Sequence, residues 1–244
     1  KKLIGASKLA TLAATQSSLR SGAGVSKIFV YEGDENYFKP HVLEEMIITY
    51  KDTNHLIDII KQTNISSLIY GCGIEVEKIN REILYFLLQQ SFRIVLDASA
   101  FSLINDDKEN FIELLFNRKA ETILTPHKSE FEKIFSYKND KIADCLEASK
   151  KTNSIILYKG NDTVISTPDG RIYISSKSSP FLATAGSGDV LAGMIGGFLS
   201  QQYTGIEATR LACYIHSECG IRLNHGLVAS DLINEIPNVL KNLN

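Results

Sequence analysis

Short runs of β-branched and aromatic residues recur along the chain and predict strands. They cover residues 27–31, 46–50, 67–72, 93–97, 121–125 and 154–158. Most of these runs are apolar at successive positions instead of alternating, as in Ile94-Val95-Leu96 and Ile155-Ile156-Leu157. Strands of this kind are covered on both faces, which is typical of a parallel sheet between two layers of helices.

Helical patterns lie between the predicted strands. In residues 76–90, for example, Ile79, Ile83, Phe86 and Leu87 stand three and four positions apart and form one apolar face. Alternating strands and helices favour right-handed crossovers in an α/β domain. No linker, repeat or low-complexity tract divides the sequence, so we expect residues 1–244 to form one domain.

Two features in the second half depart from this alternation. Residues 163–166 and 171–175 flank Pro168-Asp169-Gly170, a turn signal that predicts an antiparallel hairpin. Thr204 with Glu207 is a capping-box signature, which predicts a helix that runs to about Leu223. The expected fold is therefore a mostly parallel central sheet flanked by helices, with a late antiparallel hairpin.

The composition of the chain argues against nucleic acid and membranes as binding partners. The 244 residues include 26 Lys plus Arg and 28 Asp plus Glu, a formal charge of −2, so no basic field would draw the chain to nucleic acid or an anionic membrane. No run approaches the roughly 18 apolar residues of a membrane span. The 4 cysteines include no Cys-x-x-Cys pair, which excludes a zinc ribbon and fits reduced thiols. We therefore expect a cytoplasmic protein that binds small molecules.

The most informative stretch is residues 183–193, Ala-Thr-Ala-Gly-Ser-Gly-Asp-Val-Leu-Ala-Gly. An apolar stripe at helical spacing begins at Val190, so a helix should start near Ser187, and the glycines on its other flank imply close approach of a backbone or a ligand. Gly186 and Gly188 would leave amide N–H groups open at the front of this helix, where the helix dipole adds positive potential. Such a site suits a phosphate or a developing anion.

Two roles are open for Asp189, which falls in the first turn of the same helix. It could be a favourable first-turn carboxylate on an ordinary glycine-rich turn. It could also be the general base for a hydroxyl that attacks a phosphoryl group, a role that contributes about 10²- to 10⁴-fold. The sequence contains no Gly-Lys pair for a Walker A loop, and Gly71-Cys72-Gly73 lacks the third glycine of a dinucleotide fingerprint. The sequence is therefore compatible with phosphoryl transfer on a scaffold other than a P-loop or a dinucleotide-binding fold.

Three ordered blocks resemble the NAD(P)H-hydrate dehydratases of the ribokinase-like superfamily. Residues 183–193 resemble the anion-hole motif of that superfamily. Residues 124–131, Leu-Thr-Pro-His-Lys-Ser-Glu-Phe, are similar to the family's Leu-Thr-Pro-His-x-x-Glu-Phe, and residues 158–165 are similar to its Lys-Gly-x-x-Thr-Val-Ile. Two motifs depart from the family: its Gly-Pro-Gly-Leu-Gly stands here as residues 71–75, Gly-Cys-Gly-Ile-Glu, and its Asp-Ala-Asp as Asp97-Ala98-Ser99. The resemblance implies a three-layer ribokinase-like fold.

The resemblance also implies roles for single residues. The catalytic site would comprise Asp189 and the amides of Gly186, Ser187 and Gly188. The substrate would be lined by Ala23, Gly73, His127 and Asp189. The nucleotide would lie against Gly188 and the segment Lys159, Gly160, Asn161, Asp162 and Thr163, in which Lys159 offsets phosphate charge.

Histidines and a glutamate near these motifs have simpler interpretations. A lone histidine after a strand, such as His127, is usually structural, and it is the resemblance that implies substrate contact. Glu130 could equally be a first-turn carboxylate of a helix that begins at Ser129, and it is not counted among the catalytic residues. His216 and Glu218 stand two positions apart on a predicted helix, do not share a face, and are not expected to act as a pair.

The implied reaction is a nucleotide-dependent dehydration. ADP or ATP would phosphorylate the C6 hydroxyl of the S-epimer of hydrated NADH or NADPH, and loss of phosphate would restore the nicotinamide double bond. Mg²⁺ would bridge nucleotide oxygens, and the enzyme would be a homo-oligomer such as a tetramer. Two alternatives stay open: a ribokinase-like vitamin or sugar kinase, which would retain its phosphorylated product, and a nucleotide-binding module without turnover.

Overall fold

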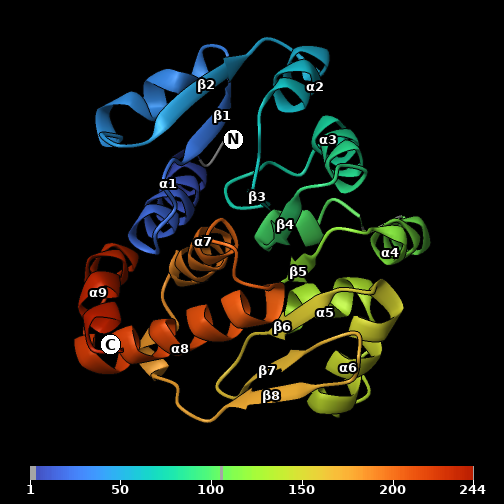
Figure 1. Cartoon of the computed structure of the whole chain (residues 1–244), viewed down its shortest axis with the longest axis vertical. Coiled ribbons are helices and arrows are strands. Elements are labelled where there is room, and N and C mark those ends of the chain that lie inside the picture. The colour runs from blue at the N-terminus through green and yellow to red at the C-terminus, as the bar shows by residue number, and fades with distance from the viewer. Residues whose placement is uncertain (1–3, 105–106, 244) are drawn as a thin grey trace.

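The structure, a computed structural model, describes residues 4–104 and 107–243. Its main sheet has the strand order β3-β4-β5-β6-β7-β8, in which β3 to β6 run parallel and β7 and β8 are antiparallel (Figure 1). The strands are β3 (Ser67–Tyr70), β4 (Arg93–Leu96), β5 (Thr122–Leu124), β6 (Ile155–Tyr158), β7 (Thr163–Ser166) and β8 (Ile172–Ser175). The predicted parallel strands and the late hairpin are both confirmed.

The first two strands stand apart from this sheet. β1 (Lys27–Tyr31) and β2 (Met46–Tyr50) form a separate parallel pair (Figure 1). Within residues 4–104 and 107–243, β1 pairs with β2 alone and β3 with β4 alone, and residues of β1 and β3 line one cavity of about 690 Å³. The sequence pattern predicts where strands lie but not which edges pair, so it could not have revealed this division.

Helices cover both faces of the main sheet, and the connections in the described part of the chain contain four short 3₁₀ helices. One face carries α1 (Ile4–Arg20), α7 (Ser187–Leu199), α8 (Gly205–Leu223) and α9 (Ala229–Lys241). The other carries α2 (Thr53–Gln62), α3 (Lys78–Leu88), α4 (Lys108–Asn117), α5 (Lys128–Ile134) and α6 (Lys141–Thr152). The 3₁₀ helices are η1 (Asp34–Tyr37), η2 (Lys39–His41), η3 (Ala98–Phe101) and η4 (Pro180–Leu182).

The central strands are buried on both sides, as their apolar runs predict. In β4, Val95 belongs to the core beneath α7 and α8, whereas Ile94 and Leu96 belong to the core beneath α3 and α4. Successive side chains of a strand point to opposite faces, so each apolar run supplies both cores. The expected three layers of helix, sheet and helix are therefore present.

Glycines on α7 allow close packing against α1, and the two helices lie side by side (Figure 1). A Cβ atom at Gly193 would lie 1.9 Å from the Ser17 hydroxyl oxygen, and one at Gly197 would lie 2.5 Å from the Ser18 carbonyl oxygen. Both separations are far below van der Waals contact, so only glycine fits. The close approach predicted from these glycines is to the backbone of a neighbouring helix.

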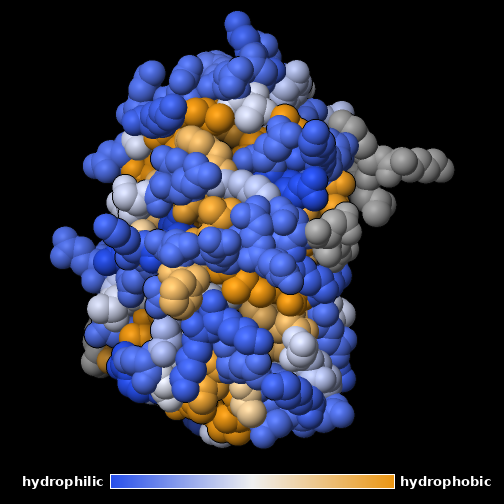
Figure 2. Space-filling view, turned by 90° about the vertical axis from the view of Figure 1, so that its right-hand side faces the viewer, coloured by the Kyte–Doolittle hydropathy of each residue, from blue (hydrophilic) through white to orange (hydrophobic). Residues whose placement is uncertain are grey.

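The surface is mixed. Figure 2 shows small apolar patches separated by hydrophilic side chains on the face that lies to the right in Figure 1. Along the described chain, no helix combines the length and the apolar character needed to cross a membrane. The four cysteines are buried and unpaired, as expected from their spacing.

Candidate active site

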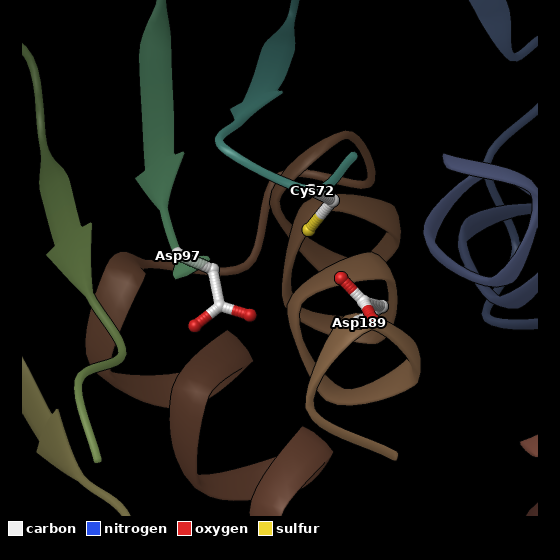
Figure 3. Close-up of side chains that lie close together, drawn as sticks. All are labelled: Cys72, Asp97 and Asp189. Carbon is white, nitrogen blue, oxygen red and sulfur yellow. The ribbon is translucent and has the colours of Figure 1, made fainter. Parts of the chain in front are cut away.

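The ends of three strands and the start of one helix meet at one edge of the main sheet. Cys72 follows β3, Asp97 follows β4, and Asp189 lies in the first turn of α7 (Figure 3). Lys159 follows β6. The carboxyl ends of parallel strands share an edge, which is where open α/β sheets bind ligands. The fold thus brings together residues that are more than a hundred positions apart.

The start of α7 has the geometry that its glycines predict. Gly186, the N-cap, has a φ of 86°, and a Cβ atom there would lie 2.9 Å from that of Ala229. The Val190 N–H donates to the Gly186 carbonyl at 3.0 Å, and the Ser187 N–H donates to Thr184 at 3.3 Å. For the Gly188 N–H, no acceptor lies within hydrogen-bond reach among residues 4–104 and 107–243. Gly188 therefore offers an amide at the start of α7 that is available to an anion.

Lys159 is an ion-paired cation beside this amide. Its Nζ lies 2.6 Å from Asp97 Oδ1 and 3.7 Å from Glu130 Oε2, and a Cβ atom at Gly188 would lie 3.3 Å from it. Burial opposes the charge on Lys159, but the two carboxylates outweigh that effect and raise its pKa. Lys159 is consequently protonated at neutral pH, and its charge is shared with Asp97 rather than free.

Asp97 is a site residue that the sequence analysis did not select. It is 2% exposed, and its Oδ1 also accepts a hydrogen bond of 2.8 Å from the Thr125 hydroxyl. The turn after β3 makes room for it: Gly71 has a φ of +119°, and a Cβ atom there would lie 1.7 Å from the Asp97 carbonyl oxygen. The Asp97-Ala98-Ser99 motif was noted only as a departure from a family pattern, so its ion pair with a lysine 62 positions later stayed hidden.

Asp189 is half-buried and, within the described chain, makes no ion pair. Burial raises its pKa, and the negative charge of Asp97 raises it further. A hydrogen bond from Cys72 and the charge of Lys159 act in the opposite direction. A carboxylate with a raised pKa is a stronger base than an exposed aspartate, which suits proton abstraction.

One ligand atom from each of Cys72, Asp97 and Asp189 lies within 4.8 Å of the others, and the three side chains converge in Figure 3. These groups do not fit a protein-held Mg²⁺, which prefers oxygen ligands in octahedral geometry. Burial and the two aspartates raise the pKa of the Cys72 thiol, which therefore stays protonated. The Lys159 ammonium already pairs with Asp97. A metal ion at this site would therefore have to arrive with the ligand.

His127 is the N-cap of α5 and is exposed. Its Nδ1 accepts from the Glu130 N–H at 3.3 Å, while Glu130 Oε2 accepts from the His127 N–H at 2.8 Å. This capping box confirms the expectation that Glu130 is a first-turn carboxylate. Burial raises the pKa of Glu130, although Lys159 and His127 oppose this. The imidazole thus caps α5. Because it is exposed, a substrate could also reach it, and substrate contact stays a prediction.

Within the predicted nucleotide segment, residues 160–162 form an exposed turn between β6 and β7, Lys159 precedes the turn and is partly buried, and Thr163 begins β7. The Thr163 hydroxyl donates to the Gly160 carbonyl at 3.0 Å. Lys141, at the start of α6, donates to the Asp162 carbonyl at 2.5 Å and lies 3.1 Å from its carboxylate. A Cβ atom at Gly160 would lie 2.6 Å from the Lys141 ammonium. The structure thus adds a second cation to this segment, which the sequence analysis missed because Lys141 belongs to an earlier helix.

The remaining predicted substrate residues line cavities next to this edge. Ala23 and Cys72 line the cavity of about 690 Å³, and Gly73 lines a neighbouring one of about 560 Å³ between the β1–β2 pair and α3. Cys72 joins them to the catalytic candidates through its hydrogen bond to Asp189. Ala23 itself makes no contact with Asp189 that the structure records.

The sheet order and the two helical layers define a three-layer α/β protein with a ribokinase-like fold. A ribokinase-like superfamily protein from Enterococcus faecalis has the same fold, with a TM-score of 0.81 and 24% identity over 96% of this chain and 82% of that one. The sequence pattern of the NAD(P)H-hydrate dehydratase family matches residues 1–240, and the chain belongs to this family.

Individual relatives agree with this membership. An ADP-dependent (S)-NAD(P)H-hydrate dehydratase from Lactococcus lactis is 29% identical over 241 residues, which are 95% of this chain and 84% of that protein. A bifunctional NAD(P)H-hydrate repair enzyme from Mycobacterium leprae is 32% identical over 155 residues, 63% of this chain. The chain spans only 30% to 48% of the length of such bifunctional relatives.

A solved structure shares the fold. The Bacillus subtilis ADP/ATP-dependent NAD(P)H-hydrate dehydratase, co-crystallised with ATP and Mg²⁺, superposes with a TM-score of 0.83 at 24% identity, covering 96% of this chain and 85% of that one.

Proposed function

We propose that this chain, acting as a single domain, catalyses the ADP- or ATP-dependent dehydration of the S-epimer of hydrated NADH or NADPH. The observation that carries the proposal is the start of α7, where the unpartnered Gly188 N–H, the Lys159 ammonium and the Asp189 carboxylate lie together. Family membership and the names of the relatives from Lactococcus lactis and Bacillus subtilis support the choice of substrates.

The first step is a phosphoryl transfer. Asp189 takes the proton of the C6 hydroxyl while the hydroxyl oxygen forms a bond to the terminal phosphorus of the nucleotide. The bridging P–O bond breaks, and AMP leaves from ADP or ADP leaves from ATP. The Gly188 N–H and the positive end of α7 stabilise the charge on the transferring group. This assigns Asp189 the base role among the two that its position allows.

The second step is an elimination. The C6–O bond breaks with its electron pair on the phosphate. The neighbouring ring carbon loses a proton to water, and the electron pair of that C–H bond forms the restored ring double bond. Hydroxide is a poor leaving group and phosphate is a good one, which explains why a nucleotide is consumed. The products are NAD(P)H, inorganic phosphate and the shortened nucleotide.

The nucleotide would lie between Gly188 and the turn of residues 160–163. Lys159 and Lys141 contribute positive charge there, but Asp97 and Asp162 offset it. A free nucleotide would therefore meet carboxylates as well as cations. Mg²⁺ bound to the phosphate oxygens of the co-substrate would reduce this repulsion, in agreement with the poor fit of a protein-held ion.

The direct test follows absorbance at the reduced-nicotinamide wavelength after hydrated NADH is mixed with the protein and either ADP or ATP. We expect an absorbance increase that depends on the nucleotide, with one phosphate released for each NADH formed. A stable phosphorylated product without an absorbance increase would instead indicate the vitamin or sugar kinase alternative. Nucleotide-dependent thermal stabilisation with no product of either kind would indicate a binding module.

The same proposal extends to location and assembly. Reduced nicotinamide nucleotides and ADP are cytoplasmic metabolites, so we place the enzyme in the cytoplasm. We expect a homo-oligomer such as a tetramer, which light scattering of the purified protein would measure. Nucleic acid and membranes have no part in this function.

A further inference from the structure

His216 of α8 contacts the first residue of α7. Its Nε2 lies 3.0 Å from the Ser187 carbonyl oxygen and 2.9 Å from the Ser187 hydroxyl oxygen. A carbonyl oxygen can only accept, so this contact requires the tautomer in which Nε2 carries the proton. Burial lowers the pKa of His216, the hydrogen bond to Ser187 opposes this and the charge of Lys159 adds to it, and together they bring the pKa to about 4. The ring is therefore neutral near pH 7 and donates to Ser187 through this single N–H.

The Ser187 carbonyl and the Gly188 N–H belong to one peptide group. That group is planar and trans, so its C=O and N–H bonds point in opposite directions, and fixing one fixes the other. A donor on the carbonyl also polarises the amide and strengthens the hydrogen bonds that its N–H gives. Gly188 carries an amide that is open at the start of α7, next to the Lys159 ammonium.

We propose that His216 is a positioning residue that orients and polarises the Gly188 amide by donating a hydrogen bond to the other end of the same peptide group. His216 acts through Gly188 and does not itself touch the nucleotide or the hydrated ring. The proposal rests on the proposed function for the identity of the bound anion, a nucleotide phosphate. It requires nucleotide binding but not dehydration, so the two can be tested separately.

Two substitutions separate the hydrogen bond from the bulk of the side chain. In His216→Gln, the side-chain amide nitrogen can occupy the place of Nε2 and keep a donor for the Ser187 carbonyl, whereas His216→Leu has a similar size and no donor. ADP affinity is measured by calorimetry in the presence of Mg²⁺, and turnover by the absorbance of NADH. His41→Leu, at an exposed position, is the matched control for a histidine-to-leucine change.

We expect His216→Leu to weaken ADP binding and to lower kcat, each by about 10-fold, because one hydrogen bond to a charged group is weakened but not removed. KM for hydrated NADH should change little, and His216→Gln should restore most of both losses. A folded His216→Leu protein with normal ADP affinity and kcat would overturn the proposal, as would equal losses in the Gln and Leu variants.

A variant that fails to fold and a wild-type protein without turnover also have defined consequences. If His216→Leu does not fold, His216→Asn takes its place: its shorter side chain does not reach the position of Nε2, so it should bind ADP more weakly than His216→Gln, and equal binding would overturn the proposal. A wild-type protein that binds ADP but does not dehydrate hydrated NADH contradicts the proposed function alone, since the affinities still test His216. A wild-type protein that binds neither ADP nor ATP contradicts both.

Discussion

The Lys159 ammonium lies 2.6 Å from Asp97 Oδ1, beside the start of α7. The pair joins the end of β6 to the end of β4, and the Lys159 N–H also donates to the Pro126 carbonyl at 2.9 Å, which adds the end of β5. The lysine is therefore held in place by three strands before any ligand binds. Asp97 therefore holds the Lys159 ammonium in position, and its negative charge also acts on Asp189.

Asp97→Asn should shift the pH dependence of catalysis. Asp189 acts as a base only when ionised, and its pKa is raised first by burial and then by the charge of Asp97. Activity should therefore fall as pH decreases through that raised pKa. Removing the charge of Asp97 lowers the pKa of Asp189, so the acid limb of kcat/KM against pH should move to lower pH. Burial is the larger cause, so part of the elevation should persist.

Thr125→Val is the control for this experiment. It removes the hydroxyl that donates to Asp97 Oδ1 at 2.8 Å but leaves the carboxylate charge in place. Its acid limb should stay closer to that of the wild-type protein than the limb of Asp97→Asn does. An acid limb of Asp97→Asn that coincides with the wild type, or that moves to higher pH, would show that Asp97 does not influence the base.

Asp189→Asn should leave ADP binding largely intact and reduce kcat by about 10²-fold or more, the usual contribution of a general base. The amide has the size of the carboxylate but cannot take a proton from the substrate hydroxyl. Turnover is measured by NADH absorbance and ADP affinity by calorimetry on the same preparation. Unchanged turnover would remove Asp189 from the mechanism and return it to the role of a first-turn carboxylate.

The sequence pattern was sufficient for the elements but not for the contacts between them. The apolar runs predicted β1 to β6, and the Pro168-Asp169-Gly170 turn predicted the hairpin. The glycines of α7 predicted the close approach of a neighbour. These signals are local, since each depends on residues within a few positions. The separation of the β1–β2 pair depends on which strand edges meet, and no local pattern records that.

The site follows the same division. Gly188 and Asp189 were found because a glycine-rich start followed by an apolar helix is a local signature of an anion site. Asp97, Lys141 and His216 were missed as site residues because each acts on a residue 20 or more positions away, across a sheet edge or between helices. Aspartate, lysine and histidine are common residue types without a local signature here, and only the fold shows which partners they have.

Gly188→Ala should weaken ADP binding by about 10-fold or more, because the added methyl group would keep a phosphate away from the Gly188 N–H and so weaken that hydrogen bond. The added Cβ would lie 3.3 Å from Lys159 Nζ and 3.7 Å from Asp97 Oδ2, in the space above the open amide. Alanine is a good helix former at this position and the separations are tight rather than forbidden, so the thermal midpoint without ligand should fall little. Full ADP affinity in this variant would place the phosphate elsewhere.

Gly71→Ala should be a stability defect with consequences at the site. The backbone there has a φ of +119°, which an L side chain rarely adopts, and the new Cβ would lie 1.7 Å from the Asp97 carbonyl oxygen. The backbone after β3 or β4 must therefore move, and we expect a loss of about 3 kcal/mol or more in the free energy of unfolding by denaturant titration.

Gly24→Ala is the matched control, because a Cβ atom there has nothing within 4 Å. Its free energy of unfolding should stay within about 0.5 kcal/mol of the wild type. Since the displaced carbonyl belongs to Asp97, the Gly71 variant that does fold should also bind ADP more weakly than its Gly24 counterpart. Equal stability of the two variants would mean that the turn after β3 can rearrange without disturbing Asp97. The close approach of the two strand ends would then not be what holds the Asp97–Lys159 pair in place.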